Sequence, residues 1–140
     1  MTILIGALIG GLLGLALLNV MALIARSAGN ACDTLTFSSN EDIVGKVDAW
    51  AKSSGYRVIS SAGGSRRYQK GYNFLTAPMF LDVVQNGMQY TLKSYVQING
   101  LIVKGDMALS ASGFMVKLPR AMAKKAHNQL RAELGQPLLQ

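Results

Sequence analysis

The chain has 140 residues, and its 14 Lys and Arg against 7 Asp and Glu give a net charge of +7. A single cysteine, Cys32, excludes a disulfide within the chain, which agrees with a reducing compartment. About 105 residues follow the apolar N-terminal run, which is enough for one small domain with its own core.

Residues 3–25 form an apolar run without a charged side chain. As a helix this run would be about 34 Å long at ~1.5 Å per residue, which matches a bilayer core of roughly 30 Å. We therefore predict a single transmembrane helix over residues 1–26. The alternatives are a cleaved secretory signal and a lipoprotein signal ending before Cys32. The secretory signal fits less well, because the run is long and no Lys or Arg precedes it. The lipoprotein signal fits less well, because Gly29 and Asn30 stand where such sites carry an apolar and a small residue.

Glycines recur every four residues in this helix, at Gly6, Gly10 and Gly14. Such a row lets the backbone of another helix approach closely, and we expect Asn19 to hydrogen-bond to that neighbour. These four residues are the predicted packing face for a larger membrane protein complex or for a second copy of the chain. The alternative is that glycine is common in membrane helices and that Asn19 lies near the interface.

The basic residues all follow the apolar run, and Arg26 comes directly after it. The positive-inside rule then predicts a single-pass protein of the inner (cytoplasmic) membrane with a cytoplasmic C-terminal domain. Residues 27–33, SAGNACD, have the small and polar composition of a linker, so the domain is expected over residues 34–140.

The first part of this domain has signals for two strands and a helix. Residues 34–37 and 56–60 are candidate strands. Between them, Glu41 and Asp42 resemble the acidic first turn of a helix, and apolar residues then recur at helical spacing until Gly55. We expect a helix that starts within residues 39–42, Ser-Asn-Glu-Asp, and ends at Gly55.

The middle of the domain has the clearest pattern, an antiparallel β-meander. Alternating runs cover residues 79–85, 88–98 and 101–109, and Asn86-Gly87 and Asn99-Gly100 separate them. Asn-Gly between alternating runs is a strong signal for a two-residue hairpin turn, which also determines the register. The predicted register pairs Val83 with Tyr90, Leu81 with Leu92, Val96 with Val103, and Lys93 with Asp106.

A second helix is predicted near the C-terminus. Pro119 suits a first helical position, and Gly135 with Pro137 ends the segment. The apolar residues Met122, Ala126, Leu130 and Leu134 follow one another at four-residue spacing. The fold class is therefore α+β, with two helices packed on an antiparallel sheet after a single transmembrane helix.

Two basic groups are candidates for binding an anionic partner. Arg120, Lys124, His127 and Arg131 form a stripe along the last helix, with Lys117 before it, and Arg66, Arg67 and Lys70 form a second cluster. Exposed at a membrane surface, such residues would contact anionic lipid headgroups or phosphates of a nucleic acid. Nucleic acid is disfavoured because no known binding motif is present. The alternative is an ordinary solvated helix surface.

Signals for catalysis are weak. The chain has one His and one Cys and no metal-ligand spacing, and Gly63-Gly64 is not followed by the Gly-Lys-Ser/Thr of a phosphate-binding loop. We expect no enzymatic activity, no metal and no cofactor, and His127 as a surface residue.

Short motifs in the second half of the chain resemble a group of small uncharacterised bacterial proteins. The motifs are Gln69-Lys70-Gly71, Leu75-Thr76-Ala77-Pro78, Gly113-Phe114, Pro119-Arg120, Asn128, Leu130 and Leu134-Gly135-Gln136-Pro137. The resemblance implies a bacterial protein with one N-terminal membrane helix and an α+β domain, a family of unknown function. It implies no activity and no site residues.

Two functions follow as expectations. The first is a non-catalytic accessory or scaffolding subunit of a membrane protein complex that docks through the glycine-rich helix. The second is a membrane-tethered module that binds anionic lipid or nucleic-acid phosphates through the basic C-terminal helix.

Overall fold

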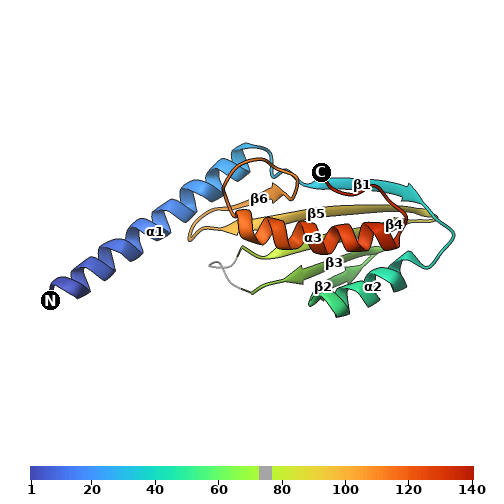
Figure 1. Cartoon of the computed structure of the whole chain (residues 1–140), viewed down its shortest axis with the longest axis horizontal. Helices are drawn as coiled ribbons and strands as arrows, with labels where there is room; N and C mark the ends of the chain where they lie inside the picture. Colours follow the sequence, from blue (N-terminus) through green and yellow to red (C-terminus); the bar gives the residue numbers. More distant parts are fainter. Residues whose placement is uncertain (73–76) are drawn as a thin grey trace.

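The structure is a computed structural model, and it describes residues 1–72 and 77–140. Leu75 and Thr76, two residues of the resemblance motifs, lie outside these ranges. The elements in chain order are α1 (Thr2–Ser27), β1 (Asp33–Ser38), α2 (Ile43–Ser54), β2 (Arg57–Ala62), β3 (Ser65–Lys70), β4 (Met79–Asn86), β5 (Gln89–Asn99), β6 (Lys104–Ala108) and α3 (Lys117–Glu133) (Figure 1).

The strands form one antiparallel sheet in the order β1-β5-β4-β3-β2, and β6 also pairs with β5. β1 and β6 share one edge of β5, since β1 pairs with residues 89–94 and β6 with residues 95–99. The predicted α+β class and the β4–β5–β6 meander are confirmed. The meander is part of a larger sheet, to which the strands predicted near residues 34–37 and 56–60 contribute β1 and β2. β3, which was not predicted as a strand, lies between β4 and β2.

The first predicted turn is displaced in the structure. Asn86 pairs with Gln89, so the loop consists of Gly87 and Met88 rather than Asn86 and Gly87. Gly87 has φ 61°, and a positive φ at the first loop position is typical of a type II′ turn. Val83 consequently lies opposite Leu92 instead of Tyr90. The register moves by two residues, so every side chain stays on its predicted face.

At the second predicted turn, the error in the strand register is larger. Val96 lies opposite Met107 instead of Val103, and residues 100–103 form a longer loop. Asp106 lies opposite Gln97, whose Nε2 donates to Asp106 Oδ1 at 2.9 Å, so the predicted pair with Lys93 does not form. The reason is the position of β1, which occupies the edge of β5 beside Lys93 and leaves β6 only the second half of that strand.

Three of the four predicted helix ends agree with the structure, but the predicted acidic first turn of α2 is wrong, because Asp42 is the N-cap and Glu41 precedes it. The Asp42 side chain accepts a hydrogen bond from the Gly45 amide at 2.9 Å, and Gly55 ends α2 with φ 78°. α3 ends at Glu133, with φ 65° at Gly135. α3 begins at Lys117 rather than at Pro119. Proline is tolerated in the first turn of a helix, because the amides there have no intrahelical partner.

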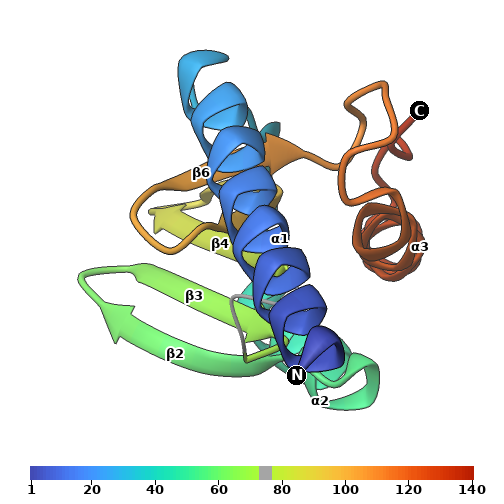
Figure 2. The same ribbon diagram turned by 90° about the vertical axis from the view of Figure 1, so that its left-hand side faces the viewer.

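The helices α2 and α3 cover one face of the sheet (Figure 2). The two helices are joined where Trp50 Nε1 donates to the Ala126 carbonyl at 2.9 Å. Beneath them lie fully buried side chains of the sheet, among them Tyr68, Leu81 and Leu92. The last turns of α1 contribute to the same core, and the rest of α1 projects away from the domain (Figure 1).

Candidate functional site: the joint between α1 and the sheet

α1 is long and apolar enough to cross a membrane, and none of the residues in its most apolar window is buried. The helix extends to Ser27, and β1 begins at Asp33, so only residues 28–32 connect them. Ala22 and Ala25 are nevertheless buried in the core of the domain, at 0% and 2% exposure. The boundary predicted after residue 26 therefore does not separate the helix from the domain.

The last turns of α1 lie unusually close to β6, at Gly105. A β-carbon on Gly105 would be 2.2 Å from the Ala22 carbonyl oxygen and 2.8 Å from the Ala25 β-carbon. No larger residue fits at position 105 without moving the helix or the strand. Small residues on both sides thus bring the two backbones together.

Asn19 makes the second contact of this joint. Its Oδ1 accepts hydrogen bonds from the backbone amides of Ile102 at 2.8 Å and Val103 at 3.4 Å. Its Nδ2 donates to the Leu15 carbonyl at 2.9 Å. We predicted that Asn19 would bond to a neighbouring helix, and the structure gives the amide partners within its own chain instead. The two partner amides lie in the β5–β6 loop, 83 and 84 residues further along, so no local sequence signal indicates them.

A second glycine makes room for Asn19. A β-carbon on Gly100 would lie 2.6 Å from Asn19 Oδ1 and 2.9 Å from its Cα. The same residue closes the β5–β6 loop, since its amide donates to the Val103 carbonyl at 2.8 Å. Gly100 was predicted as a turn residue, and α1 also packs against it at Asn19.

The segment after α1 is also held by hydrogen bonds. The Asp106 amide of β6 donates to Asn30 Oδ1 at 3.1 Å, and the Ser110 amide donates to Asp33 Oδ2 at 3.0 Å. The stretch that we predicted to be a linker is therefore bonded to β6 and to the residues that follow it.

The predicted glycine row remains open in the described part of the chain. A β-carbon on Gly6, Gly10 or Gly14 would meet nothing within 4 Å. The row turns by about 40° at each step of four residues, so Gly6 lies about 160° around α1 from Ala22. The domain therefore packs on a different side of α1 and leaves the glycine row uncovered.

The predicted basic stripe on α3 is wrong for three of its residues. Arg120, His127 and Arg131 are buried, at 5%, 1% and 7% exposure, and face the sheet. Their charges and rings have partners within the chain, whereas Lys117 is exposed and Lys124 is half-buried. The predicted apolar row shifts correspondingly, since Met122 is 50% exposed.

His127 is a core residue rather than the surface residue that we predicted. Its Nε2 and the Tyr56 hydroxyl are 3.0 Å apart in a hydrogen bond, and Trp50 packs edge-on against the ring. Burial, with a smaller contribution from nearby Arg131, lowers the pKa of His127 from 6.5 to about 3. The imidazole is therefore neutral at physiological pH.

The two buried arginines of α3 bind backbone carbonyls. The Arg120 guanidinium donates to the carbonyls of Ala111 and Gly113, in the segment before α3. Arg131 Nη1 donates to the Pro137 carbonyl at 3.1 Å, in the segment after it. These side chains tie down the two segments that flank the helix, which a stripe pattern alone does not reveal.

The second basic cluster is also engaged within the domain. Arg66 forms an ion pair with Asp48 at 2.5 Å, and Lys70 Nζ donates to the Ser54 carbonyl at 2.8 Å. Arg67 forms two parallel hydrogen bonds with Asp82, at 2.7 and 2.8 Å, and these bonds raise the pKa of Arg67. The cluster joins strands and a helix instead of forming a continuous free patch.

Within residues 1–72 and 77–140, no group of three or more His, Cys, Asp and Glu side chains is arranged to hold a metal ion. In comparisons with known proteins, no protein-family model matches this chain, and no curated protein matches it. The geometry of the joint is therefore the main guide to function.

Proposed function

We propose that this protein is a non-catalytic, single-pass subunit of a membrane protein assembly. The free part of α1 binds other integral membrane proteins, or further copies of the chain, along the row of Gly6, Gly10 and Gly14. The domain is then held at the membrane surface in a defined orientation.

The observation that carries this proposal is the joint itself. Asn19, Ala22 and Ala25 pack into the domain, so α1 and the sheet form one continuous unit. A tether that serves only to keep a module near a membrane needs no such contact. A rigid joint is useful where a partner of the helix must hold the domain at one angle.

The position of the glycine row leaves it open to a partner. At ~3.6 residues per turn, Gly14 and Gly6 lie about 80° and 160° around α1 from Ala22, so most of the row is on a different side of the helix from the contact with the domain. Close packing of helix backbones is favoured where small residues line the contact. A partner helix bound there would lie beside α1, on a side that the domain does not cover.

The distribution of charge supports the proposed membrane and orientation. All 14 Lys and Arg lie after the apolar run, and Arg26, Lys104 and Lys117 are exposed. The positive-inside rule supports a cytoplasmic membrane with the domain on the cytoplasmic side. The basic residues that remain exposed would then lie close to anionic lipid headgroups.

The proposal is tested by Gly10→Leu, with Ala16→Leu as the matched control. Both residues are exposed, and they lie about 120° apart around the helix at ~3.6 residues per turn. We expect the tagged full-length protein, extracted in mild detergent, to recover a reproducible set of membrane proteins or its own oligomer. Gly10→Leu should lose these partners, and Ala16→Leu should keep them. Equal recovery of partners by Gly10→Leu and the unaltered protein would contradict the proposal.

A further inference from the structure

The most exposed large apolar side chains of the domain lie at the end from which α1 projects. Outside α1 and among the described residues, the five most exposed large apolar side chains have exposed fractions of 67–86%. They are Tyr72, Leu101, Ile102, Phe114 and Leu118. We call these five residues the apolar rim.

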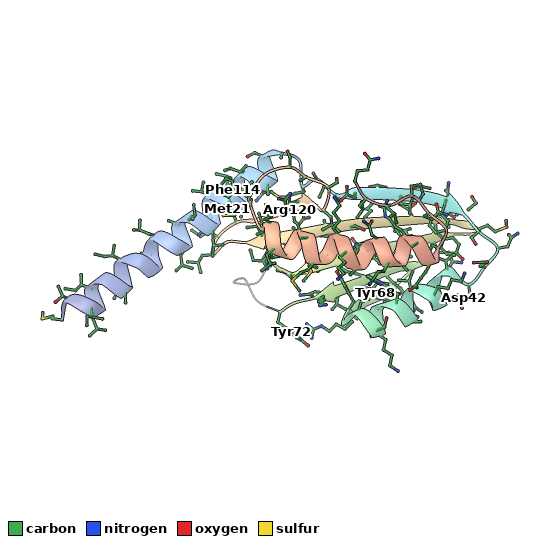
Figure 3. All side chains as sticks on the ribbon, viewed as in Figure 1. Met21, Asp42, Tyr68, Tyr72, Phe114 and Arg120 are labelled. Carbon is green, nitrogen blue, oxygen red and sulfur yellow. The ribbon has the colours of Figure 1, made fainter. Side chains whose placement is uncertain are left out.

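Three separate segments contribute to the apolar rim. Leu101 and Ile102 are in the β5–β6 loop, Phe114 and Leu118 flank the start of α3, and Tyr72 follows β3. In Figure 1 the β5–β6 loop and the start of α3 lie at the α1 end of the domain. Figure 3 shows Phe114 and Tyr72 at that same end. Scattered apolar residues are normal on a protein surface, but residues gathered at one end indicate an interaction surface.

The length of the free helix indicates what this surface contacts. Residues 2–18 precede the joint and would span about 26 Å at ~1.5 Å per residue, less than a hydrocarbon core of roughly 30 Å. Because residues 2–18 alone are shorter than the core, an α1 that crosses it places Asn19 at or just inside the boundary where the helix leaves the core. The β5–β6 loop is hydrogen-bonded to Asn19, so it reaches the same depth.

The loop is suited to that depth because three of its backbone amides are hydrogen-bonded. The amides of Ile102 and Val103 donate to Asn19, and the Gly100 amide donates to the Val103 carbonyl. Unpaired backbone groups are costly where water is scarce, so these bonds lower the cost of bringing the loop to the headgroup boundary. The segment with Phe114 is likewise held, through the bonds from Arg120 to Ala111 and Gly113.

The charges around the apolar rim fit a lipid surface. Exposed Lys104 and Lys117 adjoin the two apolar segments, and residues 99–104 and 110–118 contain no Asp or Glu. The Arg57 guanidinium lies 3.4 Å from the centroid of the Tyr72 ring. Apolar side chains bordered by cations, with a tyrosine among them, are typical of segments at the headgroup boundary.

We infer that the apolar rim inserts into the headgroup boundary of the membrane that α1 enters, so that the domain rests on the bilayer. This inference rests on the proposed membrane anchoring of α1. The occupant of the surface is lipid, and the insertion fixes the depth of the domain as well as its angle.

The test uses the full-length protein in vesicles of phosphatidylethanolamine and phosphatidylglycerol. In a Cys32→Ser background, single cysteines replace Ile102 or Leu118 in the apolar rim, Leu12 in α1, or Met88 at the far β4–β5 turn. All four positions are at least 60% exposed, so an environment-sensitive dye on the cysteine leaves the core unchanged. Spin-labelled lipids then quench each dye according to its depth in the bilayer.

We expect quenching and a blue-shifted emission at positions 102 and 118, strongest with the spin label near the headgroup, and no quenching at 88. Position 12 should be quenched by the deeper spin label. Quenching at 12 with unquenched, water-like emission at 102 and 118 would overturn the inference and leave the anchor intact. No quenching at 12 would overturn the membrane anchor and the inference together.

Discussion

Gly105 of β6 faces Ala22 of α1 at a separation that excludes any side chain, since a β-carbon would lie 2.2 Å from the Ala22 carbonyl oxygen. The atom that it would meet belongs to the backbone of a helix, which cannot rotate away as a side chain can. The contact therefore requires glycine at position 105 for steric reasons.

Gly105→Ala is expected to weaken the joint. Overpacking of a close contact costs about 1–3 kcal/mol, so the unfolding midpoint in detergent should fall. The control is Gly11→Ala, because a β-carbon on Gly11 meets nothing within 4 Å. Equal midpoints for Gly105→Ala and Gly11→Ala would show that the helix does not pack against β6.

Asn19→Ala removes the acceptor of two loop amides and should destabilise the β5–β6 loop. The loop would lose two hydrogen bonds from the amides of Ile102 and Val103, worth about 0.5–1.5 kcal/mol each. Hydrogen exchange of these two amides should accelerate in the variant. The exposed neighbour Val20, replaced by Ala, should leave the exchange unchanged. Unaltered exchange in Asn19→Ala would contradict the contact.

The mature protein is expected to retain α1. Cleavage before Cys32 would remove Ala22 and Ala25 from the core and expose the face of β6 that carries Gly105. The intact mass of the protein purified from membranes checks this directly. A mass corresponding to a chain that begins at or near Cys32 would show that the apolar run is a signal, and would remove the basis of the proposed function.

His127 should make stability depend on pH in the weakly acidic range. The unfolded chain binds a proton at His127 near pH 6.5, whereas the folded chain resists protonation until about pH 3. The unfolded state therefore binds more protons between these values, and the free energy of unfolding falls as the pH falls. The expected loss at this residue is about 2 kcal/mol between about pH 7 and pH 5.

The measurement is the urea midpoint of unfolding at both pH values, for the unaltered protein and for His127→Gln. The variant should be less stable at neutral pH, because it loses the bond to Tyr56, and its stability should fall less on acidification. An NMR titration of His127 with a midpoint near 6.5 would contradict the buried environment.

Much of the fold was predictable because its signals are local. Asp42 and Gly55 delimit α2 through caps that involve only nearby residues. Alternation predicted which side chains of β4 and β5 face the core, and this survived a register error of two residues at Gly87. The register of β6 was not predictable, because it depends on β1, a strand more than 60 residues earlier in the chain.

The candidate site was predictable only in part. The open row at Gly6, Gly10 and Gly14 was visible as a spacing, and the partners of Asn19 were not. The prediction of an exposed basic stripe on α3 was wrong because it placed the guanidinium groups of Arg120 and Arg131 in solvent. Carbonyls of the chain segments that flank α3 accept hydrogen bonds from both guanidinium groups instead, and His127 is buried in the core.

The sequence by itself determined that α1 is a long apolar helix, that an antiparallel meander follows it, and which faces of its strands are apolar. These properties depend on composition and on periods of two or about 3.6 residues, which the chain carries locally. Only the tertiary structure decided that Asn19 bonds to the β5–β6 loop and that Gly105 packs against α1. It also decided that three residues of the basic stripe on α3 are buried. Each of these depends on atoms that are distant in the chain and meet only when the sheet has formed.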